Sequence, residues 1–251
     1  MARVVSIHSF RGGTGKSSLT ASLATLVAMG GRRVGIVDTD IQSPGIHVLF
    51  GLDEQTIGNA LNDYLWGRCP IEAAAYPLDL EGVDGEVFII PASLKTGEIA
   101  RVLREGYDVT LLNDGFRDLI AALNLDYLFI DTHPGLNEET LLSIAISDVL
   151  FIVLRPDRQD YQGTGVTVEV ARKLDVPALY VIVNKVLPMF DFASVRQRVE
   201  AAYHAEVVAV LPQCDEMMQL ASEKVFGMSY PDHPLTHTLR EVARVITDGA
   251  A

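Results

Sequence analysis

Residues 4–18 read VVSIHSFRGGTGKSS, and this stretch decides the fold. A short apolar run, Val4 to Ile7, precedes a glycine-rich loop, and a segment with helical spacing, residues 17–29, follows it. Glycine permits positive φ, so backbone N–H groups of such a loop can converge on phosphate oxygens, while the following helix adds the positive end of its dipole. Strand, glycine loop and helix in this order predict a phosphate-binding loop rather than an ordinary glycine-rich turn.

Lys16 and Ser17 have specific expected roles in the loop. Lys16 supplies a positive charge for the β and γ phosphates, and the Ser17 hydroxyl is placed to ligate Mg²⁺. The usual pattern G-x-x-x-x-G-K-[ST] has glycine where this chain has Phe10, so the loop is a variant. The sequence therefore predicts ATP and Mg²⁺ as cofactors, with the nucleotide phosphates held by Gly12, Gly13, Thr14, Gly15, Lys16, Ser17 and Ser18.

The rest of the chain alternates short apolar runs with helical segments. The apolar runs are 4–7, 34–37, 87–90, 127–130, 149–154, 179–183 and 207–211. The helical segments are 17–29, 97–105, 138–147, 163–173, 192–203 and 235–246. Continuous apolar runs are typical of parallel strands covered on both faces. We expect an α/β fold: one doubly wound, mostly parallel sheet with helices on both faces, forming a single domain over 1–251 with an insertion at 51–85.

Composition excludes several classes. With 20 Lys and Arg against 33 Asp and Glu, the net charge is −13, so binding to a polyanion needs a local basic patch. The two cysteines, Cys69 and Cys214, form no CxxC pair, which argues against a disulfide scaffold, a zinc site and an iron–sulfur cluster. No apolar run is long enough to cross a bilayer and the N-terminus does not resemble a signal peptide, so we expect a cytoplasmic protein.

Four motifs carry a family resemblance. The loop resembles the deviant phosphate loop of ParA/MinD-family P-loop ATPases, KGGxGK[ST]. VDTD (37–40) matches the first switch of that family and FIDTHPG (129–135) matches the second. VIVNK (181–185) and LP (211–212) resemble its adenine-binding segments, in the same order along the chain. The resemblance covers most of the chain and implies the same fold and ATP hydrolysis.

The resemblance assigns roles to the switch residues. It implies that Asp40 orients the attacking water and that Asp38 lies nearer the Mg²⁺ shell, although a helix-cap or turn pair is the alternative for both. Asp131 ends an apolar run, where a carboxylate can bind Mg²⁺ through water, and a strand-end turn is its alternative. The Gly135 N–H is expected to sense the γ-phosphate. For His133, we favour a solvated or capping role over that of a base.

The adenine contacts rest on the resemblance as well. The Asn184 amide is expected to pair with the adenine edge, Lys185 to lie beside the nucleotide, and Pro212 to offer a flat surface for the ring. Without the upstream motifs, Asn184 would be interpreted as a turn former, which is the more common role of an asparagine at a strand end.

Arg11 stands where the family has a lysine that reaches across a dimer to the nucleotide of the partner. Because arginine keeps the positive charge, we include Arg11 in the catalytic set. Its side chain differs in geometry from that of lysine, so Arg155, Arg158 and Lys185 are the alternatives for the charge that reaches across the dimer. A few relatives that position carboxysomes, the McdA-like proteins, are similar in lacking this lysine. That subgroup is the favoured neighbour.

The function expected first is a ParA-type switch. Such a protein forms an ATP-bridged homodimer, binds nonspecific DNA and positions a plasmid, chromosome or carboxysome, until an adaptor stimulates hydrolysis. This implies a nucleoid-associated location and phosphate contacts with steep salt dependence. Acidic neighbours make solvated helix faces the alternative for the candidate DNA contacts, which are Arg196, Arg198, Lys224, Arg240 and Arg244.

Two other functions remain open at this point. A MinD-like membrane-associated regulator would need an amphipathic C-terminal anchor, but residues 235–251 lack a lysine-rich polar face and are better interpreted as a packed final helix. Membrane binding is therefore not expected. A biosynthetic ATP-dependent enzyme of the same fold, acting on a small-molecule acceptor, is the remaining alternative.

Overall fold

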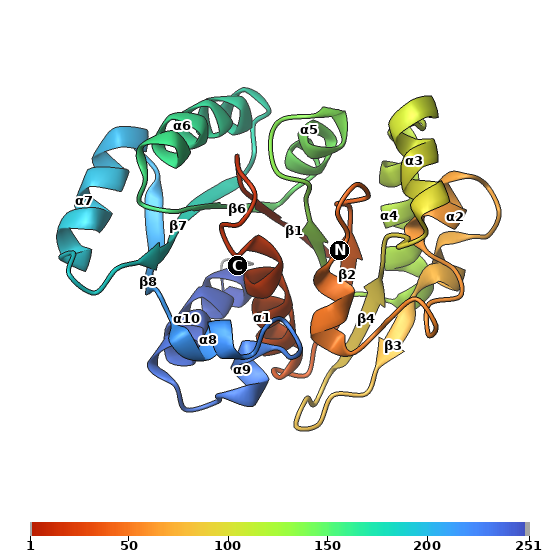
Figure 1. The fold of residues 1–251 in the computed structure, drawn as a ribbon, viewed down its shortest axis with the longest axis horizontal. Coiled ribbons are helices and arrows are strands. Elements are labelled where there is room, and N and C mark those ends of the chain that lie inside the picture. The colour runs from red at the N-terminus through yellow and green to blue at the C-terminus, as the bar shows by residue number, and fades with distance from the viewer. Residues whose placement is uncertain (1, 249–251) are drawn as a thin grey trace.

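The computed structural model describes residues 2–248 as one eight-stranded sheet with helices on both faces (Figure 1). The strand order is β3-β4-β2-β5-β1-β6-β7-β8, and every neighbouring pair is parallel except β3 and β4. The strands are β1 Arg3–His8, β2 Arg33–Asp38, β3 Tyr76–Leu78, β4 Glu86–Ile90, β5 Tyr127–Asp131, β6 Val149–Leu154, β7 Ala178–Val186 and β8 Glu206–Pro212. The predicted doubly wound, mostly parallel α/β fold is confirmed.

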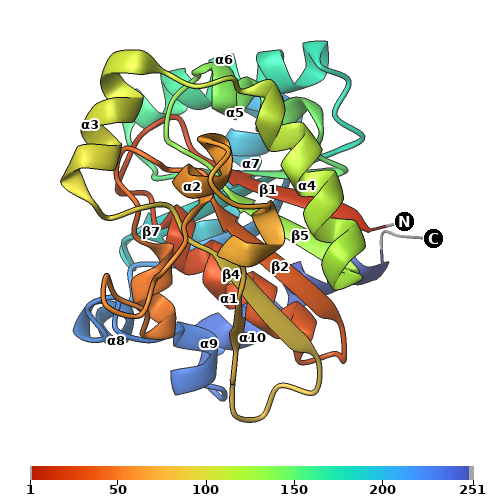
Figure 2. The same cartoon turned by 90° about the vertical axis from the view of Figure 1, so that its right-hand side faces the viewer.

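The helices divide between the two faces of the sheet (Figures 1 and 2). Helices α1, α9 and α10 cover one face, whereas α2 and α4 cover part of the other face and α6 and α7 cover the rest. The longer helices are α1 Lys16–Ala28, α3 Thr96–Glu105, α4 Thr110–Leu123, α5 Glu138–Ala145, α6 Arg158–Lys173, α7 Phe192–Tyr203 and α10 Pro234–Asp248. The short ones are η1 Ile46–Phe50, α2 Leu61–Leu65, η2 Ile71–Ala74, α8 Asp215–Gln219 and α9 Phe226–Ser229. Within residues 2–248, no helix has the length and apolar character needed to span a bilayer.

Burial follows the pleat of the strands. In β2, Ile36 packs under α1 while its neighbour Val37 packs into the cluster of α2 and α4 on the opposite face. This is why the strands read as continuous apolar runs: both faces are covered. All seven predicted runs lie within strands.

Helix α4, strand β3 and the five short helices η1, α2, η2, α8 and α9 were not predicted. Helix α4 carries Leu112, Phe116 and Leu119 at helical spacing, and these residues are buried, so its periodicity was present in the sequence. Strand β3 is only three residues long and lies in the expected insertion, where it pairs antiparallel with β4 and extends the sheet edge. The final helix α10 packs its apolar residues against α1, which confirms the expectation for residues 235–248, whereas residues 249–251 lie outside the described residues.

Side-chain caps fix the start of several helices on the carboxyl side of the sheet. Asn137 accepts a hydrogen bond from the Thr140 N–H at the start of α5, and Asp191 accepts one from the Ser194 N–H at the start of α7. Asp157 caps α6 in the same way. The loops between strands and helices are thereby held at the edge where a ligand of this fold class binds.

Phe10 anchors the glycine loop to α6. Its ring lies so close to Gly163 that a Cβ added there would be 1.9 Å from the Phe10 Cδ1 atom. This contact explains how the loop accommodates a large side chain where the usual pattern has glycine. Only glycine at position 163 leaves room for the ring.

Gly163→Ala is expected to displace the Phe10 ring and destabilise the protein by about 1–3 kcal/mol, as overpacking of a filled site does. Urea denaturation measures this change. Gly165→Ala is the matched control on the same helix, because its added Cβ would meet Tyr203 at an ordinary 3.6 Å and alanine favours a helix. Equal stability of the two variants would contradict the anchoring role of Phe10.

Candidate nucleotide site

A cavity of about 350 Å³ lies beside the glycine loop at the carboxyl edge of the sheet. Strand β1 lies between β5 and β6, so the loop that follows it occupies the middle of this edge. The cavity is lined by Ser9, Gly12, Gly13, Thr14, Gly15, Lys16, Ser17, Ser18, Asp40, Ser43, His133, Pro134 and Lys185. The structure thus brings the predicted phosphate loop together with residues of both predicted switches.

A buried ion pair joins the loop to the second switch. The Lys16 Nζ donates to Asp131 Oδ1 at 2.9 Å, and the Thr20 hydroxyl donates to the same oxygen at 3.1 Å. Lys16 is 7% exposed and Asp131 is 1% exposed. In this structure, the charge expected to meet phosphate is therefore neutralised by a carboxylate from β5. Thr20, one turn after Ser17 in α1, was not among the predicted site residues.

Asp38 stabilises the backbone conformation of the first switch through two hydrogen bonds. It is fully buried, and its two oxygens accept hydrogen bonds from the Asp40 N–H at 3.0 Å and the Gly45 N–H at 3.1 Å. Asp38 also lies opposite Asp131 in the pairing of β2 with β5. Burial, followed by the negative charge of Asp131, raises the pKa of Asp38 to about 8.

Asp40 lies at the wall of the cavity. Its Oδ1 accepts from the Ser43 N–H at 3.1 Å and lies 3.7 Å from the His133 Nε2, while burial raises the pKa of the carboxyl. The His133 Nδ1 lies 2.6 Å from the Pro134 carbonyl oxygen, which can only accept, so Nδ1 carries a proton. The Nε2 of His133 then faces Asp40 favourably when the ring is protonated.

The lining residues fit a triphosphate and a divalent cation. The buried Thr14 hydroxyl has no hydrogen-bond partner among the described residues, and Gly13 and Gly15 adopt positive φ, which turns the loop backbone toward the cavity. Asp38 and Asp131 lie opposite each other on β2 and β5, and the charge of Asp131 adds to the effect of burial in raising the pKa of Asp38. A cation held by them with Ser17 would offset this unfavourable arrangement. When bound, Mg²⁺ would screen phosphate charge and orient the nucleotide.

The residues expected to contact adenine instead support the loop. The Asn184 amide donates to the Thr14 carbonyl at 2.8 Å and its oxygen accepts from the Lys185 N–H at 2.9 Å. The Lys185 Nζ donates to the Gly13 carbonyl at 2.8 Å. Pro212 ends β8, beside the end of β7. The adenine contact of Asn184 remains a prediction that requires the amide to exchange partners.

Gly135 belongs to a second tie between switch and loop. Its N–H donates to the Ser9 carbonyl at 3.1 Å, and its φ is +90°. A γ-phosphate that engages this N–H, as predicted, must compete with Ser9.

Arg11 faces an acidic pair on its own chain. Its Nη1 lies 3.7 Å from Asp160 and 3.8 Å from Asp157, both at the start of α6. Arg155 contacts the same carboxylates at 3.3 and 3.1 Å. Neither aspartate was predicted as part of the site, although an Asp at the cap of a helix that follows a strand is a readable signal. Arg11 therefore lies beside the start of α6.

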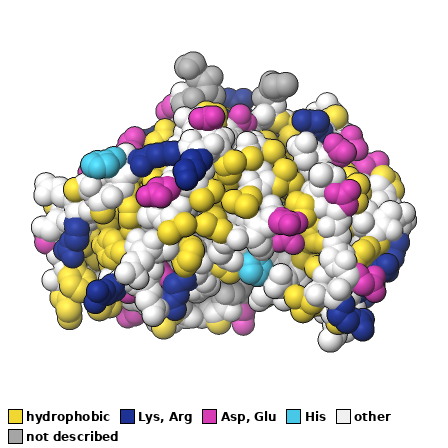
Figure 3. All heavy atoms as spheres, turned by 90° about the horizontal axis from the view of Figure 1, so that it is seen from above, with side chains coloured by type: hydrophobic (Ala, Val, Ile, Leu, Met, Phe, Trp, Pro, Cys, Tyr) yellow, Lys and Arg dark blue, Asp and Glu magenta, His cyan; other side chains and the backbone are white. Residues whose placement is uncertain are grey.

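The candidate DNA contacts lie on separate surfaces. Arg196 and Arg198 are on α7, Lys224 lies between α8 and α9, and Arg240 and Arg244 are on α10. Helices α7 and α10 cover opposite faces of the sheet (Figure 1). On the face that Figure 3 shows, Lys and Arg side chains are interspersed with Asp and Glu and with hydrophobic side chains, without a continuous basic strip.

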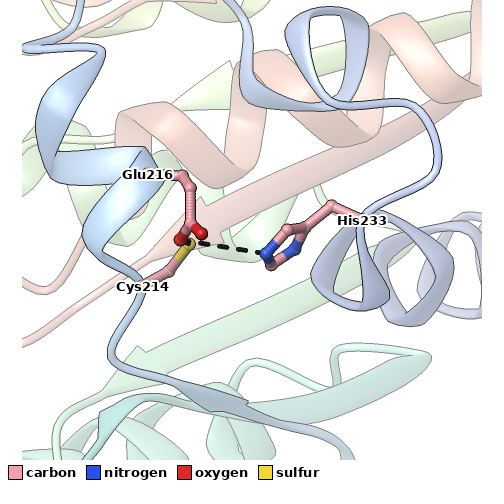
Figure 4. A group of neighbouring side chains, drawn as sticks. All are labelled: Cys214, Glu216 and His233. Atoms are coloured by element: carbon pink, nitrogen blue, oxygen red, sulfur yellow. Dashed lines mark hydrogen bonds and ion pairs between the residues drawn. The ribbon is translucent and has the colours of Figure 1, made fainter.

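Cys214, Glu216 and His233 form a cluster near the start of α8 (Figure 4). The Cys214 Sγ donates to Glu216 Oε2 at 3.3 Å, and the His233 Nε2 lies 3.9 Å from that oxygen. The His233 Nδ1 accepts from the Leu235 N–H, so the proton of a neutral ring lies on Nε2. Because a metal needs the lone pair of Nε2, this hydrogen bonding opposes metal binding.

The sequence model of the ParA family, described as NUBPL iron-transfer P-loop NTPase, matches residues 1–246. The chain belongs to the ParA family of P-loop NTPases. An uncharacterized ATP-binding protein of Methanocaldococcus jannaschii is 29% identical, over 97% of this chain and 87% of the relative. An iron–sulfur cluster carrier protein of Pseudomonas fragi is 26% identical, over 98% and 85% of the two chains.

Solved structures of this ParA-family fold are similar throughout the chain. The cell division ATPase MinD of Pyrococcus furiosus has a TM-score of 0.83 at 21% identity and covers 100% of both chains. The McdA–ATP complex of Cyanothece has a TM-score of 0.79 at 16% identity, over 98% of this chain and 96% of McdA. At these identities, the similarity shows the fold alone.

Lys16→Ala is expected to lower ATP affinity by about 100-fold or more, because a charged contact to phosphate is lost. Calorimetric titration with ATP measures this, and a urea denaturation curve confirms that the variant is folded despite the uncompensated Asp131. Lys173→Ala, at the exposed end of α6, is the control. Micromolar or tighter binding by Lys16→Ala would contradict the assignment of the phosphate loop.

Asp38 gives a pH dependence of known sign. Its folded pKa, about 8, lies above its ordinary value of 3.8, so the folded state holds more protons between these values and stability falls as pH rises through them. Urea denaturation of the nucleotide-free protein from pH 5 to pH 8 is expected to show this fall, and Asp38→Asn is expected to flatten it. An unchanged slope in the variant would contradict the raised pKa.

Proposed function

We propose that this ParA-family chain is a Mg²⁺-dependent ATPase that works as a nucleotide-driven dimerisation switch, binds nonspecific DNA and positions a cargo. The observation that carries the proposal is the Lys16–Asp131 ion pair, which connects the phosphate loop directly to the second switch strand. A ligand that takes Lys16 must change the surroundings of Asp131. Nucleotide binding and switch conformation are thereby coupled.

Different residues around the cavity would bind the phosphates and orient the attacking water. The phosphates of ATP would be held by the loop N–H groups and by Lys16, which exchanges Asp131 for a phosphate oxygen. Asp40 lies at the cavity wall, where its carboxylate can hold and orient a water against the γ-phosphate. The Asp40 side chain is 13% exposed and lies 3.7 Å from the His133 Nε2, so it is partly shielded from solvent beside the cavity.

The dimerisation part of the proposal rests on Arg11. Arg11 lies near Asp157 and Asp160 at distances that are long for ion pairs, and Arg155 contacts both carboxylates more closely. Arg11 is 40% exposed and is held only weakly. It is therefore available to reach the nucleotide of a second copy, as the lysine of the family does.

The other candidate functions fit the chain less well. A cluster carrier needs paired thiolates, whereas Cys69 follows α2 near the β4 side of the sheet and Cys214 follows β8 at the opposite edge. A membrane regulator of MinD type needs an apolar helix face available to lipid, whereas that face of α10 is packed on α1.

Asp40→Ala is expected to bind ATP but not hydrolyse it, because the water is no longer oriented while phosphate binding survives. The variant should therefore accumulate as a nucleotide-bound dimer, which light scattering detects as a doubled mass with ATP and a monomer mass with ADP. Normal hydrolysis by Asp40→Ala would show that the role of Asp40 is wrong.

The Asp40→Ala variant also tests the proposed binding to nonspecific DNA. Binding to a nonspecific duplex is expected with ATP only, and to weaken steeply as salt is raised, because it rests on phosphate contacts. The same variant with ADP and the protein without nucleotide are the controls. Absence of DNA binding by an ATP-bound dimer would remove the DNA-based form of the proposal while leaving the switch.

A further inference from the structure

A second cavity of about 350 Å³ lies at the far end of α1 from the phosphate loop, between α1 and α10. Its apolar floor includes Leu26 and Val27 of α1 and Ala243 of α10. With 13 residues, α1 is about 20 Å long, so this groove is clearly separate from the nucleotide cavity at the other end. We name the cavity the α1/α10 groove.

Three arginines surround the floor of the groove. Arg32 comes from the turn after α1, and Arg240 and Arg244 come from one side of α10, one helical turn apart. Within residues 2–248, Arg32 forms no ion pair, and the Arg240 Nη1 lies 3.1 Å from the His237 Nδ1. The three arginines give the groove a positive lining in a chain whose net charge is −13.

The carboxylates near the groove offset only part of this charge. Arg244 forms a 2.7 Å ion pair with Glu241, but both side chains are about two-thirds exposed, at 64% and 66%, so solvent screens the pair. Asp248 lines the end of the groove. The charged residues that line the groove are therefore three arginines and the carboxylate of Asp248.

The shape of the groove distinguishes among polyanions. A DNA backbone is convex and presents phosphates, so it could touch the arginines at the rim but could not cover an apolar floor. A peptide can do both, placing an apolar side chain on Leu26 and Ala243 while its carboxylates pair with the arginines. We propose that the α1/α10 groove is a docking site for an acidic peptide segment of a partner protein, one that carries apolar side chains among its carboxylates.

Helix α1 joins this groove to the nucleotide site. The groove is built on the same helix whose first residue is Lys16, and α1 packs along its length against the sheet and against α10. A partner docked here therefore leaves the ATP cavity and the Arg11 surface uncovered. The docking itself does not depend on the proposed ATPase cycle, so the two can fail separately.

The test uses a fluorescein-labelled twelve-residue peptide in which leucine and phenylalanine alternate with glutamate and aspartate, titrated with the full chain by fluorescence anisotropy. Saturable binding is expected, and Arg32→Glu combined with Arg240→Glu should weaken it at least about 10-fold. Arg117→Glu combined with Lys173→Glu makes the same change in net charge on exposed parts of α4 and α6, away from the groove, and should leave the affinity within about 2-fold.

Further ligands distinguish an acidic peptide with apolar side chains from other anions that could bind the groove. A peptide with serine in place of its apolar residues should bind at least about 10-fold more weakly, because the floor is then uncovered. The proposal is overturned if this peptide binds equally well, if the control variant weakens binding as much as the groove variant, or if no saturation occurs. It is also overturned if a short DNA duplex or phosphatidylserine vesicles bind more tightly than the peptide through Arg32 and Arg240.

Discussion

The contact between Lys16 and Asp131 is the interaction on which the rest of the site depends. It joins the first residue of α1 to the last residue of β5 inside a region with almost no solvent, where removing one partner leaves an uncompensated charge that costs several kcal/mol. A phosphate can replace the carboxylate at Lys16 because it carries more charge. Asp131 then needs a new partner, and a cation shared with Asp38 is the obvious one.

The fold makes this contact possible by bringing together residues that are far apart in the chain. Lys16, Asp38 and Asp131 follow or end three different strands, and those strands are neighbours in the order β2-β5-β1. Because all three strands are parallel, their carboxyl ends meet at one edge. The same edge receives the end of β7, whose Asn184 and Lys185 brace the loop through its carbonyl oxygens.

Much of this could be predicted from the sequence, for identifiable reasons. Strands covered on both faces are continuous apolar runs, and a glycine loop between strand and helix has few other uses, so the fold and the position of the phosphate site could be inferred. Strand β3 could not be inferred from the sequence, because a strand of three residues is too short to show periodicity. Helix α4 could have been found from Leu112, Phe116 and Leu119. The partners of Arg11 and Asn184 depend on side-chain geometry across elements, which spacing does not encode.

Several groups expected to meet the nucleotide are hydrogen-bonded to other residues of the chain, and ATP binding would exchange these contacts. The Gly135 N–H is bound to Ser9, Lys16 to Asp131 and Asn184 to Thr14, and each is a group expected to meet the nucleotide. Such exchange couples binding to conformation, because a ligand shifts an equilibrium only through contacts that differ between the two states. The most direct test is phosphate release by the purified chain at saturating ATP, with Mg²⁺ and with the metal chelated. Steady turnover that requires Mg²⁺ is the predicted result, and the absence of turnover in both conditions would contradict the account.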